Sequence, residues 1–506
     1  MAAVQDPRPT IVIAGGGTAG WMAAAAFARF LGPTHRLRLV ESDEIGTVGV
    51  GEATIPQIRL FKDALGIDED ALLRATNGTF KLGIEFVGWR EPEHRYMHAF
   101  GAVGRDVGLI AFQHYWLRAR RMGVAKPLDA YALNEIAARK GRMYRGGPLT
   151  ARAIPDMPYA YHFDANLFAR MLRTFAEANG VERIEGRILD VEQNESGDVA
   201  ALALDGERRI EGDVFIDCTG FRALLIEQTL RTGFEDWSHW LPCDRALAVP
   251  SARTEPLIPY TRATARAAGW QWRIPLQHRT GNGLVYCSTQ LSDEAAAETL
   301  LGNLDAAPIA DPRPLRFTTG KRRLGWNRNV IAMGLSSGFL EPLESTSIHL
   351  IQSAISRLLQ LLPGRTISDA DRSEYNRQTD FEMERVRDFL ILHYALNQRP
   401  EPFWQACRTM TLPDTLRHKL ELFATNGRIV REHEELFTEV GWLQVLVGQG
   451  AEPQGYHPLA DAIEPGELAE YMHTIEALYA REAEAMPRHE DFIARYCGAQ
   501  DAAAAA

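Results

Sequence analysis

A glycine turn near the start constrains this chain more than any other feature; it lies in PTIVIAGGGTAGWMAAAAFARF (residues 9–30). The apolar run over residues 11–14 predicts a buried strand, and the alanine-rich run after the glycines predicts a helix. Gly15, Gly17 and Gly20 have GxGxxG spacing. This spacing allows a tight turn, close approach of a pyrophosphate to the backbone, and close packing of helix on strand.

A second predicted strand supports a dinucleotide site. RLRLVES (residues 36–42) ends near Glu41, 21 residues after Gly20, where an acidic side chain can bind the ribose hydroxyls of an adenine dinucleotide. Thr18 and Ala19 open the intervening helix, whose free amides can hold phosphate. Strand, glycines, helix, strand and acid in this order favour such a site over a glycine turn in another α/β fold.

Two later strands also run into glycine turns, in GDVFIDCTGFRA (residues 212–223) and NRNVIAMGLSSGF (residues 327–339). This arrangement is typical of FAD-binding flavoproteins rather than of NAD dehydrogenases, whose glycine motif lies in one contiguous doubly wound domain. The usual Asp is missing from the second turn, so backbone amides at Gly334 and Leu335 would replace it. We therefore predict an α/β fold of the two-dinucleotide, flavoprotein monooxygenase type.

Composition excludes several other classes of function. With 55 Lys and Arg against 66 Asp and Glu, the net charge is −11, which argues against nucleic acid or an anionic membrane as a partner. No run of about 18 apolar residues predicts a membrane span. The five cysteines form no CxxC pair and no metal-binding motif is present, so we expect a cytoplasmic protein without a metal.

Several motifs together resemble the flavin-dependent halogenases of the tryptophan halogenase type. They are GGGTAG (15–20), GEATIP (51–56), TFKLGIEF (79–86), YHFDANLFARML (161–172), GWQWRIP (269–275) and GFLEPLESTSIHL (338–350). The WxWxIP and FxxPLES pair is the specific part. One departure is Ser347, where many members have Gly.

The resemblance implies the activity and its catalytic residues. Reduced FAD reacts with oxygen to a C4a-hydroperoxide, halide attacks it, and Lys81 holds the resulting hypohalous acid or becomes a haloamine. On its own, Lys81 would be interpreted as a solvated strand residue. Glu344 would polarise the halogenating species or take the proton from the ring. The backbone amides of Thr346 and Ser347 would bind bromide or chloride, although Glu344 could instead be an acid at a helix start.

Further residues are placed by the same resemblance. Gly49, Glu52 and Ala53 in VGVGEATIP would contact the flavin, whereas the residues alone also allow Glu52 to cap the following helix. A second group would separate flavin from substrate or line the substrate pocket: Trp270, Trp272, Ile274, Pro275, His98 and Phe100. Near GWLQVLVGQG (residues 441–450) no charged anchor for an amino acid is visible, so free indole or another indole-type aromatic is expected.

The predicted organisation is a halogenase core over residues 1–375, with a sheet insertion near 240–310. A helical region that covers the substrate follows over 376–498, and residues 499–506 form a disordered tail. A separate flavin reductase would supply reduced FAD, and a homodimer is compatible with this picture. The alternatives are a flavin-dependent aromatic hydroxylase and a flavin-binding protein without redox chemistry.

Overall fold

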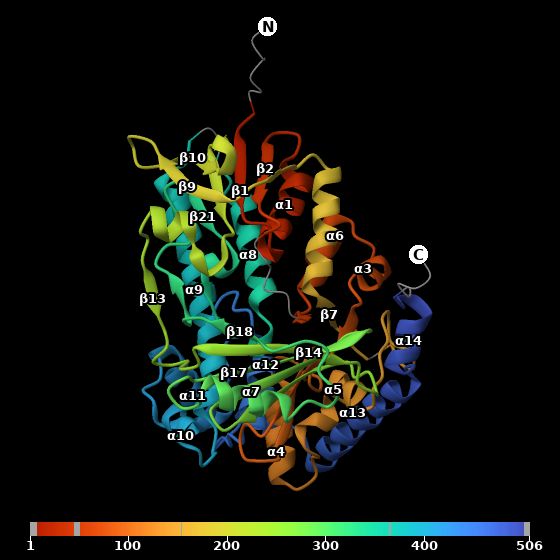
Figure 1. Cartoon of the computed structure of the whole chain (residues 1–506). Coiled ribbons are helices and arrows are strands. Elements are labelled where there is room, and N and C mark those ends of the chain that lie inside the picture. The colour runs from red at the N-terminus through yellow and green to blue at the C-terminus, as the bar shows by residue number, and fades with distance from the viewer. Residues whose placement is uncertain (1–7, 45–50, 153, 364–365, 500–506) are drawn as a thin grey trace.

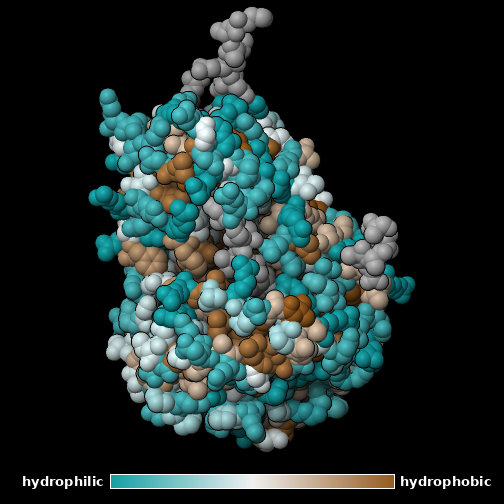
Figure 2. All heavy atoms as spheres, in the orientation of Figure 1, coloured by the Kyte–Doolittle hydropathy of each residue, from teal (hydrophilic) through white to brown (hydrophobic). Residues whose placement is uncertain are grey.

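The computed structural model describes residues 8–44, 51–152, 154–363 and 366–499. Gly49 and almost all of the predicted tail therefore lie outside the described residues. Most of the face in Figure 2 is hydrophilic, as the net charge of −11 leads us to expect. None of the helices in the described ranges has the length and apolarity needed to cross a bilayer.

A six-stranded sheet forms one half of the molecule, the upper half in Figure 1. Its order is β20 (Trp326–Asn327), β21 (Val330–Ala332), β12 (Val214–Asp217), β1 (Thr10–Ala14), β2 (Arg36–Glu41) and β8 (Glu182–Glu185). All pairs except β20–β21 are parallel. The carboxyl ends of β1, β2 and β12 therefore lie side by side, which is where such sheets bind ligands.

Helices and a small sheet cover the two faces of this six-stranded sheet. Helices α1 (Thr18–Leu31), α6 (Ala165–Ala178) and α8 (Ser347–Gln360) pack together on one side. The sheet β11 (Arg209–Glu211), β10 (Val199–Leu204) and β9 (Ile188–Gln193) forms a separate apolar cluster with β1 and β12. Both faces of the central strands are thus buried, as parallel sheets require.

A seven-stranded sheet forms the other half, lower in Figure 1. Its order is β18 (Arg313–Arg316), β14 (Arg245–Ala252), β17 (Arg279–Tyr286), β16 (Gly269–Pro275), β15 (Thr261–Arg266), β5 (Gly83–Val87) and β6 (Arg95–Ala99). Strands from the expected insertion thus complete a sheet that β5 and β6 begin, through the parallel pair β5–β15.

Two small sheets connect the halves. One is β3 (Gly51–Ala53), β7 (Ala160–Asp164) and β4 (Thr79–Lys81), which brings Glu52 and Lys81 onto strands that share one partner. The other is β13 (Phe234–Asp236), β19 (Gly320–Arg322) and β22 (Gly338–Phe339). Helices between these strands are α2 (Ile58–Leu65), α3 (Glu69–Ala75), α4 (Phe112–Arg121), α5 (Leu133–Arg139) and α7 (Asp293–Leu301).

The C-terminal region is helical. Its helices are α9 (Asp369–Ala395), α10 (Pro402–Thr409), α11 (Asp414–Asn426), α12 (Glu439–Gly448), α13 (Pro465–Ala485) and α14 (His489–Tyr496). Helix α9 contacts β20 and α8 as well as α10, α11 and α12, so it joins the two halves. The boundary expected at residue 376 falls inside this helix, which begins at Asp369 because Ser368 caps it.

Candidate active site

The glycine turn after β1 is built by close approaches of backbone. Gly15 has φ +109°, and a Cβ there would lie 2.3 Å from the Cys218 carbonyl oxygen. A Cβ at Gly20 would lie 1.9 Å from the Gly15 oxygen, whereas a Cβ at Gly17 would meet no atom within 4 Å. Gly15 and Gly20 thus allow strand, turn and helix to pack, and Gly17 leaves open space beside the helix start for a phosphate group.

Glu41 lies against this turn at the end of β2. Its carboxylate pairs with Arg183 at 2.6 Å, and a Cβ at Gly16 would fall 1.5 Å from its Oε2. Gly16, which the motif leaves unspecified, is therefore also required. The acid expected to bind ribose lies beside the glycines, as the spacing predicts.

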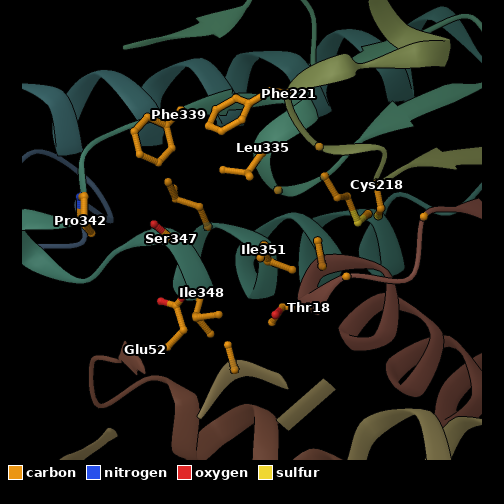
Figure 3. A pocket seen from close by; sticks show the side chains of 18 of the residues that line it. Thr18, Glu52, Cys218, Phe221, Leu335, Phe339, Pro342, Ser347, Ile348 and Ile351 are labelled. Carbon is orange, nitrogen blue, oxygen red and sulfur yellow. The ribbon is translucent and has the colours of Figure 1, made fainter. Parts of the chain in front are cut away.

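The turn and the acid open into a cavity of about 540 Å³ between the two halves. In Figure 3, Thr18 and Cys218 lie toward one end of it, and Glu52, Ser347 and Pro342 toward the other. The predicted residues that line it are Gly15, Gly17, Thr18, Ala19, Glu41, Glu52, Ala53, Trp270, Trp272, Ile274, Gly334, Leu335 and Ser347. The open space at Gly17 for a phosphate group and the indole rings of Trp270 and Trp272 in the cavity wall fit a flavin dinucleotide.

Glu52 is a strand residue at the wall of this cavity. It lies in β3 opposite Phe163 of β7, and burial raises its pKa to about 7. The alternative interpretation as a helix cap is wrong, because α2 begins only at Ile58 and has Gln57 at its N-cap.

Lys81 is completely buried at the end of β4. Its Nζ donates to the Thr54 carbonyl and to the Ser345 hydroxyl, both at 2.9 Å, and lies 5.3 Å from the centre of the Phe100 ring. Burial lowers the pKa of Lys81 to about 7, although the negative charge of Glu344 opposes this shift. The interpretation of Lys81 as a solvated residue is therefore wrong.

Glu344 is buried between two histidines. His98 Nδ1 lies 2.9 Å from its Oε2, and His393 Nε2 lies 2.8 Å from its Oε1. Burial raises the pKa of Glu344, but His98 and His393 outweigh burial and bring that pKa down to about 2. Glu344 is thus a permanent carboxylate near neutral pH.

The turn that follows Glu344 connects the surroundings of Lys81 to the cavity. Ser345 has φ +61°, an uncommon conformation for a residue with a side chain, and it presents its hydroxyl to Lys81. Thr346 occupies the N-cap of α8 but makes no side-chain capping bond. Ser347 begins the helix and lines the cavity, so the backbone amides of this helix start are available to an anion.

Comparison with known proteins identifies the family. A model of the tryptophan halogenase family matches residues 10–465. The chain is 33% identical to the 7-chloro-L-tryptophan 6-halogenase KtzR of Kutzneria sp., over 96% of this chain and 99% of the relative. This chain belongs to the tryptophan halogenase family.

Solved structures of flavin-dependent halogenases agree with this family. Xcc4156 from Xanthomonas campestris superposes with a TM-score of 0.94 at 50% identity and covers 97% of this chain and 99% of its own. BrvH from Brevundimonas sp. BAL3 has a TM-score of 0.92 at 46% identity and covers 97% and 100%. The predicted family, α/β fold class and enzyme class are confirmed.

The residues of β16 predicted to form the wall between flavin and substrate do not all line the cavity. Trp270 and Trp272 lie on one face of β16 with ring centres 6.1 Å apart, and a Cβ at Gly283 would lie 2.0 Å from the Trp272 ring, so this glycine makes room for it. Among the described residues that line the cavity, Ile274 is present and Pro275 is not. The Pro275 carbonyl instead accepts a hydrogen bond from Thr79, which indicates a packing role.

Sequence reasoning missed four residues of the site. Ser345 and Thr54 lie inside quoted motifs, so their partnership with Lys81 could have been suspected. Glu341 also lies in a quoted motif and accepts hydrogen bonds from Trp270 and Tyr394. His393, within the apolar stretch of α9, carried no signal at all.

Proposed function

We propose that this halogenase uses reduced FAD and oxygen to brominate or chlorinate an indole-type aromatic substrate, with Lys81 and Glu344 as catalytic residues. The proposal rests mainly on the burial of Lys81 between Thr54 and Ser345. Ser345 lines the cofactor cavity and Thr54 follows Ala53, which also lines it, so Lys81 is positioned just behind the cavity wall.

FAD is proposed to lie with its pyrophosphate at Gly17 and its flavin between Glu52 and the Trp270–Trp272 wall. When bound in reduced form, it supplies hypohalous acid from oxygen and halide. A separate flavin reductase is the proposed transient source of reduced FAD, and the backbone amides of Thr346 and Ser347 are the proposed halide ligands. The cytoplasm is the proposed compartment, in keeping with five buried free cysteines.

Lys81 would hold the halogenating species. An ammonium group has three donors, and two of them serve Thr54 and Ser345. The third is left to bind the oxygen of hypohalous acid and to turn its halogen toward the substrate. Because Thr54 and Ser345 belong to different elements, they define the direction of that third donor.

Glu344 would act on the cationic ring formed when halogen adds. Its negative charge, held by His98 and His393, stabilises that cation, and a carboxylate suffices to take a proton from so acidic a species. Phe100, beside Lys81, offers an aromatic face to the substrate. The Trp270–Trp272 wall keeps substrate away from the flavin, which disfavours direct hydroxylation.

The substrate is proposed to be free indole or a neutral indole derivative. Helix α12 packs on β6, the strand of His98, and its Trp442, Leu443 and Val445 are buried and apolar. No charge is thus offered by these residues to an amino acid. KtzR, which is named for a chlorinated tryptophan, is 33% identical to this chain, whereas the more similar Xcc4156 and BrvH are known only as flavin-dependent halogenases.

The test is turnover with a flavin reductase, FAD and bromide, with indole or L-tryptophan as substrate and mass spectrometry of the product. Brominated indole, formed with kcat/KM at least equal to that of tryptophan, is expected. A hydroxylated product would favour the monooxygenase alternative, and no product with bound FAD would favour the non-redox alternative. A strong preference for tryptophan would refute the substrate proposal alone.

A further inference from the structure

A column of buried aromatic rings leads from the cofactor cavity into the C-terminal helices. Trp272 and Trp270 line the cavity, with ring centres 6.1 Å apart. Trp89, in the bend after β5, is 6.2 Å from Trp270, and Tyr394 of α9 is 5.3 Å from Trp89. Rings at these spacings are in or near edge contact, which is close enough for an electron to pass from one to the next.

The column ends at a carboxyl group that can take a proton. The Tyr394 hydroxyl donates to Glu341 Oε2 at 2.7 Å, and the Trp270 N–H donates to the same oxygen at 2.8 Å. Glu341 is fully buried, and its Oε1 has no hydrogen-bond partner among the described residues. Burial raises the pKa of Glu341 to about 7, so both protonation states occur near neutral pH.

The chemistry of these side chains differs from that of an ordinary core. Indole and phenol rings are among the side chains most easily oxidised by one electron, and an oxidised phenol is stable only if its proton leaves. A base at hydrogen-bond distance meets that requirement. Here the phenol with a bonded carboxyl group lies at the inner end of the column, and the indoles lie toward the cavity.

We propose that the column Trp272–Trp270–Trp89–Tyr394 carries single oxidising equivalents away from the cofactor cavity to Tyr394, with Glu341 as acceptor of the phenolic proton. The inference rests on the proposed binding of FAD in that cavity. It gives the halogenase a means of removing oxidants that arise in unproductive turnover from the neighbourhood of Lys81.

Electrons and protons balance in each step. Trp272 gives one electron to a one-electron oxidant of the flavin or reactive-oxygen class. Trp270 then reduces the oxidised Trp272, and Trp89 reduces the oxidised Trp270. Tyr394 supplies the last electron, and its O–H bond breaks as the proton moves to the Glu341 carboxylate. The products are a neutral tyrosyl radical, a neutral glutamic acid and a reduced oxidant.

The test uses light-excited oxidised FAD, bound to the full chain, as the oxidant. Illumination of frozen samples is expected to produce a tyrosyl radical by electron paramagnetic resonance. Tyr394→Phe should lose that signal. Trp270→Phe should lose it as well, because Trp270 both neighbours Trp89 and shares Glu341 Oε2 with Tyr394, and flash spectroscopy should show a tryptophan radical in its place.

Trp116→Phe is the matched control. Trp116 is as buried as Trp270, but Trp116 lies on α4, outside the column. This variant should keep the tyrosyl signal. Glu341→Gln removes the proton acceptor and should also lose the signal, while a tryptophan radical remains.

Two outcomes would overturn the inference: a full tyrosyl signal in Trp270→Phe, or no light-induced protein radical in parent protein that binds FAD and halogenates. Failure of the protein to bind FAD would instead refute the proposed function. FAD absorbance and product analysis on the same preparation distinguish these cases. Should Trp270→Phe not fold, Tyr394→Phe and Glu341→Gln still test the end of the column.

Discussion

The cofactor cavity and the Lys81–Glu344 cluster lie next to each other but are built in opposite ways. The cavity is open, and backbone glycines at 15, 16, 17 and 20 shape one end of it. The cluster is closed and polar, and each charged group in it is held by side chains from other elements. A bulky cofactor needs free volume, whereas a reactive halogen species needs a few donors at defined positions.

Because of this difference, substitutions in the two regions should affect different properties of the enzyme. Substitutions in the cavity should act on cofactor affinity through shape. Substitutions in the cluster should act on turnover through charge, with little effect on FAD binding, because Lys81 and Glu344 lie behind the cavity wall. The predictions below test that separation, beginning with the largest effect.

Lys81→Met is expected to abolish halogenation, since it removes the donor that holds the halogenating species and keeps much of the side-chain length. FAD titration should give an unchanged Kd. Product formation and Kd are measured on the same preparation. Retained halogenation would exclude Lys81 from the mechanism, and lost FAD binding would show that cavity and cluster are not separable.

Glu344→Gln should lower kcat by about 10²-fold, the usual size of a lost acid–base group, because the volume stays and the charge is lost. Glu382→Gln is the matched control. Glu382 is a half-buried carboxylate with a histidine and an arginine as partners and a pKa of about 2, but it joins α8 to α9. Its variant should lower thermal stability and leave kcat within a few-fold, and an equal loss of kcat in both variants would contradict a specific role for Glu344.

Gly17→Ala should weaken FAD binding by about tenfold, or about 1.4 kcal/mol, because the added methyl group enters the space left for the pyrophosphate. Gly466→Ala is the control. A Cβ at Gly466 on α13 also meets no atom within 4 Å, so it tests the substitution away from the cavity. Isothermal titration with FAD gives both values, and equal affinities would place the pyrophosphate elsewhere.

The pH dependence of kcat should be a smaller, few-fold effect. It distinguishes whether the ammonium form or the neutral amine form of Lys81 is active. Its pKa is lowered to about 7, so the ammonium form dominates below that pH and is lost above it. If the ammonium holds hypohalous acid, kcat falls as pH rises through 7. If the neutral amine forms a haloamine, kcat rises instead. Glu52 also has a pKa of about 7, so a Glu52→Gln profile shows which group is observed.

The cofactor region could be predicted from sequence because its residues act locally. Gly15, Gly17 and Gly20 work through their own backbone, and Glu41 ends the adjacent strand. The cluster could be predicted only through family motifs, since Lys81 and Ser345 are 264 residues apart. His393 could not be predicted, because no local pattern distinguishes a histidine that contacts a carboxylate from one that packs in a helix core.

The parallel pair β5–β15 joins residues 84–87 to residues 261–264, and this has a consequence for synthesis on the ribosome. At about 5–20 residues per second, the chain takes tens of seconds to extend from Lys81 to Ser345, which is 264 positions later. Until residues 261–264 emerge, β5 lacks its partner β15 and has an unpaired edge, which is a hazard for association with other chains. Assembly of the site is therefore a late event in translation, because Ser345 and His393 must emerge before Lys81 and Glu344 have their partners.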